Sequence, residues 1–236
     1  MKSCINEMKE TQPDVSVPTY RRLQYVLLAA CIFIAPMSLS AWLALCPQYG
    51  NPACPTNADP LAALTAFRAA NPQLMPAFLF LTIVIPYVYP LSCIGLGLVP
   101  MKRSPWLSTI GIACGLVGSV PWGYIADQTF QLNAMARLGN DPLFAMVERN
   151  YFSNWEITVV AGGWVLGHLV AYLLLGLALA RSRAVPLWAA ALIVISVPLM
   201  GPIAYGSGNG IIQVAGFALV FLGSIPAAFA LLKRKE

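Results

Sequence analysis

The only histidine of the chain, His168, lies in a long apolar stretch between two aromatic residues. Trp164 comes four residues before it and Tyr172 four residues after it. In a helix this spacing puts all three side chains on one face. An ionisable group inside a membrane is costly, so it often marks a functional site. His168 is therefore a candidate proton donor or hydrogen-bond anchor for a ligand. The competing interpretation is a neutral imidazole bonded to a nearby hydroxyl or backbone carbonyl.

Prolines interrupt the other apolar stretches and often stand next to aromatic residues. Two segments combine both features, Pro86-Tyr87-Val88-Tyr89-Pro90 and Pro121-Trp122-Gly123-Tyr124. A proline removes one helix hydrogen bond and frees a carbonyl. At membrane depth such freed groups are best tolerated against protein or a watery cavity. We therefore hypothesise a pocket open to the outer leaflet. Its predicted lining is Tyr87, Tyr89, Trp122, Tyr124, Trp164, His168 and Tyr172.

Two acidic residues, Asp127 and Glu156, flank the predicted ends of adjacent apolar stretches. Two carboxylates at one membrane depth could share a proton. With His168 assisting, they are candidates for acid catalysis. The simpler interpretation gives each acid a structural role. Glu156 would favour the start of a helix through the helix dipole, and Asp127 would be solvated or paired with Arg137 or Arg149.

The cysteines predict a disulfide rather than a metal site. Cys46 and Cys54 fall in the same loop, and in an oxidising compartment they are the natural pair. No C-x-x-C occurs, and a single histidine leaves no metal-ligand cluster. The phosphate-cradling glycine loop, G-x-S-x-G and H-E-x-x-H motifs are also missing. We predict neither a metal nor another cofactor.

The elements that position these residues are membrane-spanning helices. The chain has 236 residues, of which 58% are hydrophobic and only 10% charged, whereas soluble domains carry about 25% charged residues. A span needs about 20 apolar residues. The sequence predicts an all-α, polytopic helical membrane bundle over residues 23–236, preceded by a mobile cytoplasmic tail over residues 1–22. Its six predicted spans are residues 23–45, 75–100, 105–126, 157–180, 186–205 and 210–232.

The basic residues predict the orientation. Eleven of the 14 Lys and Arg residues fall on the side of the two termini, and three (Arg68, Arg137, Arg149) fall in the other loops. Positive residues collect in the cytoplasm, so both termini are expected there, in a plasma membrane or a bacterial inner membrane. The net charge of +5 follows from these short clusters. Because no basic stripe with interleaved aromatic residues occurs, nucleic-acid binding is not expected.

Two outer loops, residues 46–74 and 127–156, are long enough to hold short amphipathic helices. Asp59-Pro60-Leu61 and Asp141-Pro142-Leu143 are both typical helix starts, with an acid as cap and proline in the first turn. The two passages, DPLAALTAFR and DPLFAMVER, lie 82 residues apart, each before a span that enters from outside. A duplicated hairpin is one explanation.

Small residues predict close helix contacts. Gly111, Gly115 and Gly118 follow one face of the third span, and Gly163 and Gly167 form a G-x-x-x-G in the fourth. Such faces allow helices to approach closely. The contact could lie within the chain, with a membrane protein partner, or with a second copy.

Three functions fit these observations. The favoured one is binding of a lipophilic small molecule or lipid in an outward-facing intramembrane pocket, for sensing, export assistance or immunity. The second is an enzyme acting on an isoprenoid or lipid by acid catalysis, with terpene-cyclase-like chemistry in which aromatic rings stabilise positive charge. The third is a structural or assembly subunit of a membrane complex.

Overall fold

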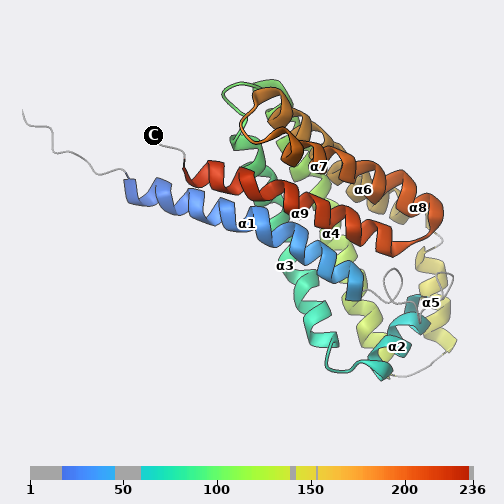
Figure 1. The fold of residues 1–236 in the computed structure, drawn as a ribbon. Helices are drawn as coiled ribbons and strands as arrows, with labels where there is room; N and C mark the ends of the chain where they lie inside the picture. The colour runs from blue at the N-terminus through green and yellow to red at the C-terminus, as the bar shows by residue number, and fades with distance from the viewer. Residues whose placement is uncertain (1–17, 46–59, 139–141, 153, 234–236) are drawn as a thin grey trace, which may run out of the picture.

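The computed structural model describes residues 18–45, 60–138, 142–152 and 154–233, and within these ranges every regular element is a helix (Figure 1). The elements are α1 (Pro18–Leu45), α2 (Pro60–Ala70), α3 (Met75–Leu98), α4 (Pro105–Leu138), α5 (Pro142–Phe152), α6 (Trp155–Ser182), α7 (Leu187–Pro198), the π-helix η1 (Leu199–Ile203), α8 (Ala204–Ser207) and α9 (Gly210–Leu232). Six segments are long and apolar enough to cross a membrane. They are α1, α3, α4, α6, the run from α7 to α8, and α9. The predicted all-α multi-pass bundle is confirmed.

The six spans form a closed ring. Each packs against the next in the chain, and α9 returns to pack along α1 (Figure 1). Inside the ring, α3 also contacts α6 and α9. Large apolar side chains such as Phe80, Val117 and Leu166 remain exposed on the outer surface. A soluble protein would seldom expose so many, whereas in a bilayer this surface meets lipid tails.

The fourth helix is longer than the sequence predicted. α4 continues to Leu138, although the apolar stretch was expected to end at residue 126. The first part of the expected second outer loop is therefore helical and continuous with α4. Thr129, Leu132 and Asn133 are buried on one face of this extension, where α2 packs against α4. The extension contains several polar and charged residues, so it was not recognised from the sequence as part of an apolar stretch. α1 likewise begins at Pro18, before the expected residue 23.

Among the described spans, only the fifth departs from α-helical geometry at its prolines. The helices remain continuous through their internal prolines, which are Pro36, Pro86, Pro90, Pro121 and Pro226. In the fifth span two prolines, Pro198 and Pro202, stand one turn apart, and the chain widens there into η1. The Ala204 N–H reaches the Leu199 carbonyl, five residues back. This wider turn of π-helix accommodates the residues that cannot donate a backbone hydrogen bond.

Two short helices, α2 and α5, lie at the end of the bundle opposite the start of α1 and the end of α9 (Figure 1). They begin at Pro60 and Pro142, as the sequence predicted. The apolar residues of α2, including Leu61, Leu64 and Phe67, are buried, so this helix packs on protein. α2 and α5 therefore form part of the tertiary structure, while the proposed duplication stays a prediction.

Two polar contacts hold α2 and α5 in place. The Arg68 guanidinium donates from Nη1 to the Asn133 Oδ1 of α4 at 2.9 Å. The Leu61 N–H, in the first turn of α2, donates to the Glu148 Oε1 of α5 at 2.7 Å. Glu148 is only 3% exposed. A carboxylate at a helix N-terminus satisfies a free N–H and interacts favourably with the helix dipole.

Candidate functional site

Five ring-bearing side chains from three helices meet in the middle of the bundle, and we call them the central aromatic cluster. Its members are Tyr89 of α3, Trp164, His168 and Tyr172 of α6, and Phe217 of α9. The Tyr89 ring centroid lies 5.1 Å from that of Trp164 and 6.0 Å from that of Tyr172. The Trp164 and His168 centroids are 4.8 Å apart. Phe217 lies 5.8 Å from His168 and 6.4 Å from Tyr172, which closes the cluster.

His168 is fully buried in this cluster, with 0% of its surface exposed. Its Nδ1 lies 2.8 Å from the Trp164 carbonyl oxygen, one helical turn back. A carbonyl oxygen can only accept, so Nδ1 must carry the proton in this hydrogen bond. In the neutral imidazole Nε2 is then an acceptor. Nε2 has no hydrogen-bond partner among the described residues.

The Tyr172 hydroxyl is in the same situation. Tyr172 is fully buried, and its phenol oxygen makes no hydrogen bond within the described part of the chain. Tyr172 and His168 share one face of α6, and both rings contact Phe217. Across the cluster, Tyr89 lies beside the thiol of Cys93. The cluster therefore combines apolar ring surface with buried polar atoms that have no partner in the described ranges.

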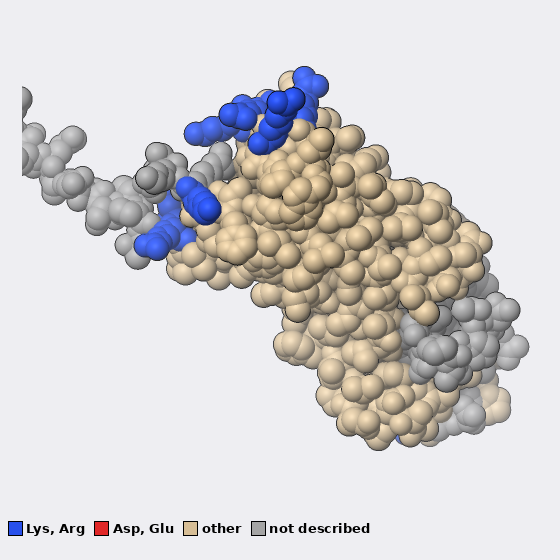
Figure 2. Space-filling model, in the orientation of Figure 1, with Lys and Arg blue, Asp and Glu red and all other residues tan. Residues whose placement is uncertain are grey.

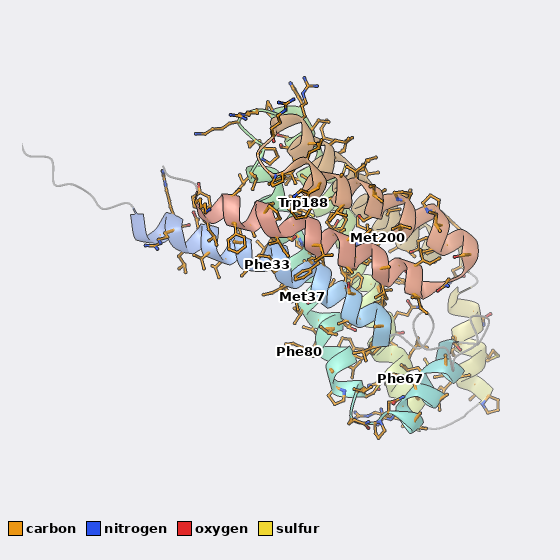
Figure 3. All side chains as sticks on the ribbon, viewed as in Figure 1. Phe33, Met37, Phe67, Phe80, Trp188 and Met200 are labelled. Atoms are coloured by element: carbon orange, nitrogen blue, oxygen red, sulfur yellow. The ribbon has the colours of Figure 1, made fainter. Side chains whose placement is uncertain are left out.

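A chain of aromatic rings continues from the cluster toward α2. Trp164 contacts Trp122 of α4, with ring centroids 4.6 Å apart. Trp122 contacts Trp42 of α1 at 5.1 Å, and Trp42 stacks on Phe78 of α3 at 5.6 Å. Phe78 in turn meets Phe67 of α2 at 6.3 Å, at the α2 end of the bundle (Figure 3). Aromatic ring contacts are thus continuous from the central aromatic cluster to α2.

The indole N–H groups of Trp122 and Trp42 donate to α3 near Pro86, where the helix lacks a backbone hydrogen bond. Pro86 has no N–H for the Thr82 carbonyl, four residues earlier in α3. The Trp122 Nε1–H donates to that oxygen at 3.0 Å. The Trp42 Nε1–H donates to the Thr82 hydroxyl at 2.8 Å, and this hydroxyl donates to the Phe78 carbonyl at 2.9 Å. The carbonyl freed by Pro86 is therefore satisfied by protein.

The structure brings together most of the predicted pocket residues, but not all. Tyr89, Trp122, Trp164, His168 and Tyr172 are buried in one connected set of ring contacts. Tyr124 is half-buried on α4. Tyr87 is 69% exposed, so it faces away from the bundle and lies outside the buried set of rings. It is two residues from Tyr89, and a helix directs such neighbours to different sides.

Sequence reasoning missed three contributors, namely Trp42, Thr82 and Phe217. Phe217 belongs to a buried face of α9 that recurs at helical spacing, with Gln213, Val220 and Ser224. That spacing could have identified an inward face. It could not have shown that the face meets His168, because the contact depends on how α9 closes the ring.

The two candidate catalytic acids are exposed and lie on helix surfaces. Asp127 is within α4 rather than at its end, and its Oδ2 accepts from Gln131 Nε2 at 2.6 Å. Glu156 stands in the first turn of α6, where the helix dipole favours an acid. Neither acid takes part in the central aromatic cluster. Their role in catalysis stays a prediction.

The glycine faces are used within the chain. A Cβ added to Gly118 would lie 2.7 Å from the Gly167 Cα, which shows direct backbone contact between α4 and α6. Gly111 and Gly115 are buried against side chains of α6 and α3, and Gly163 faces a proline ring of α4. The contact predicted from these glycines is intramolecular. The proposal that they hold a partner has no support from this packing.

Cys46 and Cys54 lie outside the described residues, so their disulfide stays a prediction. Within the described ranges Cys31, Cys93 and Cys114 are free thiols. No group of three or more His, Cys, Asp or Glu residues in the described ranges could hold a metal ion.

No protein-family model, no curated protein and no solved structure matches this chain.

Proposed function

We propose that this multi-pass membrane protein binds a lipophilic small molecule or lipid inside its helical bundle, at the central aromatic cluster. One observation carries the proposal. His168 Nε2 and the Tyr172 hydroxyl are fully buried, lie on one face of α6, and have no hydrogen-bond partner among the described residues. A buried unpaired polar group costs about 1–3 kcal/mol. In the hydrocarbon core no bulk water relieves that cost, whereas a bound molecule with a polar group would.

The distribution of charge supports an outward-facing site. Lys and Arg side chains gather at the end of the molecule where α1 begins and α9 ends (Figure 2). Positive residues favour the cytoplasmic side, so α2 and α5 would face outward. The aromatic chain from Trp164 to Phe67 leads to that outer end. These buried rings link the cluster to that end of the bundle by continuous apolar packing.

Orientation can be tested by thiol labelling in intact cells. In a cysteine-free background, Gln73→Cys precedes α3 at the proposed outer end and Lys233→Cys follows α9 at the inner end. Both positions are exposed. A membrane-impermeant maleimide is expected to label position 73 only. Labelling of position 233 alone would reverse the proposed topology.

Binding without turnover suits sensing, export assistance or immunity. The alternative of an enzyme with acid catalysis would use Asp127 and Glu156, and both are exposed rather than held beside the aromatic cluster. The alternative of an assembly subunit relied on glycine faces that α4 and α6 use against each other. Neither alternative gains a specific observation from the fold.

Native mass spectrometry of the protein released from lipid nanodiscs tests the binding site. The wild type is expected to carry a discrete bound mass, and His168→Phe, which keeps a ring but removes the acceptor, is expected to lose most of it. Ser196→Ala is the matched control, because Ser196 is also fully buried but its hydroxyl bonds to the Ile193 carbonyl at 2.6 Å. A wild type without any bound mass, or equal occupancy in His168→Phe, would refute the site.

A further inference from the structure

We infer that the group recognised at the central aromatic cluster is the hydroxyl of a lipophilic alcohol, which donates to His168 Nε2 and accepts from the Tyr172 phenol. This inference rests on the proposed function, because it names the chemistry of the ligand bound there.

His168 is a neutral imidazole with one nitrogen left to accept a hydrogen bond. Its Nδ1 proton is committed to the Trp164 carbonyl at 2.8 Å. A second proton on Nε2 would place a full positive charge among rings, and the groups that face the imidazole are the rings of Trp164 and Phe217. Burying such a charge unpaired is very costly. Nε2 is therefore a bare acceptor, and its natural partner is a hydrogen-bond donor.

Tyr172, in contrast to His168, offers a hydrogen-bond donor that lacks an acceptor. A phenol O–H is a donor, and here it is fully buried without an acceptor in the described chain. Side chains one turn apart on a helix have Cβ atoms about 5–6 Å apart. Both rings also contact Phe217, so the two polar atoms belong to the same cluster. One ligand oxygen could thus serve both residues.

The polar groups that a ligand could place between His168 and Tyr172 differ in how many hydrogen bonds they satisfy. A hydroxyl both donates and accepts through a single atom. An ether, ester or ketone oxygen only accepts, so His168 Nε2 would stay unpaired. An ammonium or a carboxylate would bring a charge, and the ring contacts of the cluster offer none of the opposite sign. A primary amide would leave an extra N–H unsatisfied, and a secondary amide donates and accepts through two separate atoms rather than one. The hydroxyl is the group that pairs both atoms at the least cost.

The remainder of the ligand must be apolar. Trp164, Trp122 and Trp42 continue from the cluster as a series of edge-to-face rings. This surface suits a hydrocarbon tail directed toward α2. Either an isoprenoid or a straight alkyl chain presents the same alcohol, so the experiment includes both.

The test compares alcohols with their methyl ethers, which keep the oxygen and the tail but cannot donate. Farnesol and farnesyl methyl ether form the isoprenoid pair, and 1-hexadecanol and hexadecyl methyl ether form the alkyl pair. Apparent Kd values are measured by native mass spectrometry of nanodisc-embedded protein. At least one alcohol is expected to bind about tenfold more tightly than its ether, the scale of one hydrogen bond plus one unpaired buried acceptor. The pair whose alcohol binds more tightly shows whether the ligand tail is isoprenoid or alkyl.

Two variants separate the two hydrogen bonds. In His168→Phe the preference for alcohol over ether is expected to fall below about twofold. In Tyr172→Phe both ligands are expected to weaken by the same factor, because both oxygens accept from the phenol while only the alcohol donates. Ser196→Ala should keep the wild-type preference. Circular dichroism checks that each variant folds. If His168→Phe does not fold, the test rests on Tyr172→Phe, in which equal weakening of alcohol and ether supports the inference.

Each other outcome is informative. Equal binding of alcohol and ether by the wild type would overturn the hydroxyl inference and leave the proposed function standing. Unchanged binding of both ligands in Tyr172→Phe would also overturn the inference. Failure of all four probes to bind a wild type that carries a discrete bound mass would overturn the inference alone, whereas a wild type without any bound mass would refute the proposed function as well.

Discussion

Replacement of Trp122 by phenylalanine is expected to destabilise the bundle through a backbone carbonyl rather than through lost ring area alone. The indole Nε1–H of Trp122 donates to the Thr82 carbonyl at 3.0 Å. That carbonyl lacks its usual helix partner because residue 86 is proline. Phenylalanine keeps an aromatic ring between Trp42 and Trp164 but has no donor. The Thr82 carbonyl would then be buried without its indole donor.

The magnitude follows from two contributions. An unpaired buried carbonyl costs about 1–3 kcal/mol, and measured side-chain hydrogen bonds in membrane bundles average about 0.6 and reach about 1.7 kcal/mol. Partial loss of the edge-to-face contacts, at 5.1 Å to Trp42 and 4.6 Å to Trp164, adds about 0.5–1 kcal/mol. We expect Trp122→Phe to lower the free energy of unfolding by about 2 kcal/mol in total.

A double-mutant cycle isolates the hydrogen-bond contribution. Pro86→Ala restores an N–H that can bond to the Thr82 carbonyl, because α3 is already helical at residue 86. In that background Trp122→Phe no longer leaves the carbonyl unpaired. The cost of Trp122→Phe should therefore fall by about 1 kcal/mol, which exceeds the usual additivity error of about 0.3–0.5 kcal/mol. Pro226→Ala in α9 is the matched control, since its freed carbonyl is far from Trp122 in the chain.

The assay is equilibrium unfolding in mixed micelles of dodecyl maltoside and sodium dodecyl sulfate, followed by far-UV circular dichroism. This signal does not depend on the tryptophan that is removed. Additive effects of Trp122→Phe and Pro86→Ala would refute the reasoning, as would an equal coupling with Pro226→Ala. In either case the indole would be an ordinary packing group.

Two further changes can be measured alongside. Gly118→Ala is expected to lower the free energy of unfolding by about 2 kcal/mol or more, because its Cβ would lie 2.7 Å from the Gly167 Cα. Gly123→Ala, where a Cβ meets nothing within 4 Å, should be neutral or stabilise by about 0.5–1 kcal/mol, and equal losses at both sites would contradict the packing. Glu148→Gln should weaken its hydrogen bond to the Leu61 N–H by about 1 kcal/mol. Faster amide exchange confined to α2 and α5 is expected, and unchanged exchange there would count against that contact.

The membrane character and the spans could be predicted from the sequence. A helix that crosses hydrocarbon needs a long apolar stretch whatever its neighbours are, so local composition located all six. α9, for example, begins at Gly210 and ends at Leu232, where it was expected. Proline at the first helical position likewise predicted the starts of α2 and α5. These features depend on a residue's neighbours in the chain and on the solvent.

The extension of α4 past residue 126 could not be predicted in this way. It has too many polar residues to be recognised as a span, and it is helical where α2 covers one of its faces. Asp127 accordingly lies within a helix rather than at the end of a span. The tertiary contact with α2 buries one face of this part of α4.

The candidate site was decided largely by the fold. The spacing of Trp164, His168 and Tyr172 is enough by itself to place them on one face of a helix. Tyr87 and Tyr89, by contrast, have the same chemistry and stand two residues apart, yet one is 69% exposed and the other fully buried. Helical periodicity separates them to different sides, but which side is inward depends on where the neighbouring helices lie. The closing of α9 onto α1 brings Phe217 to His168, and no local pattern contains that long-range contact.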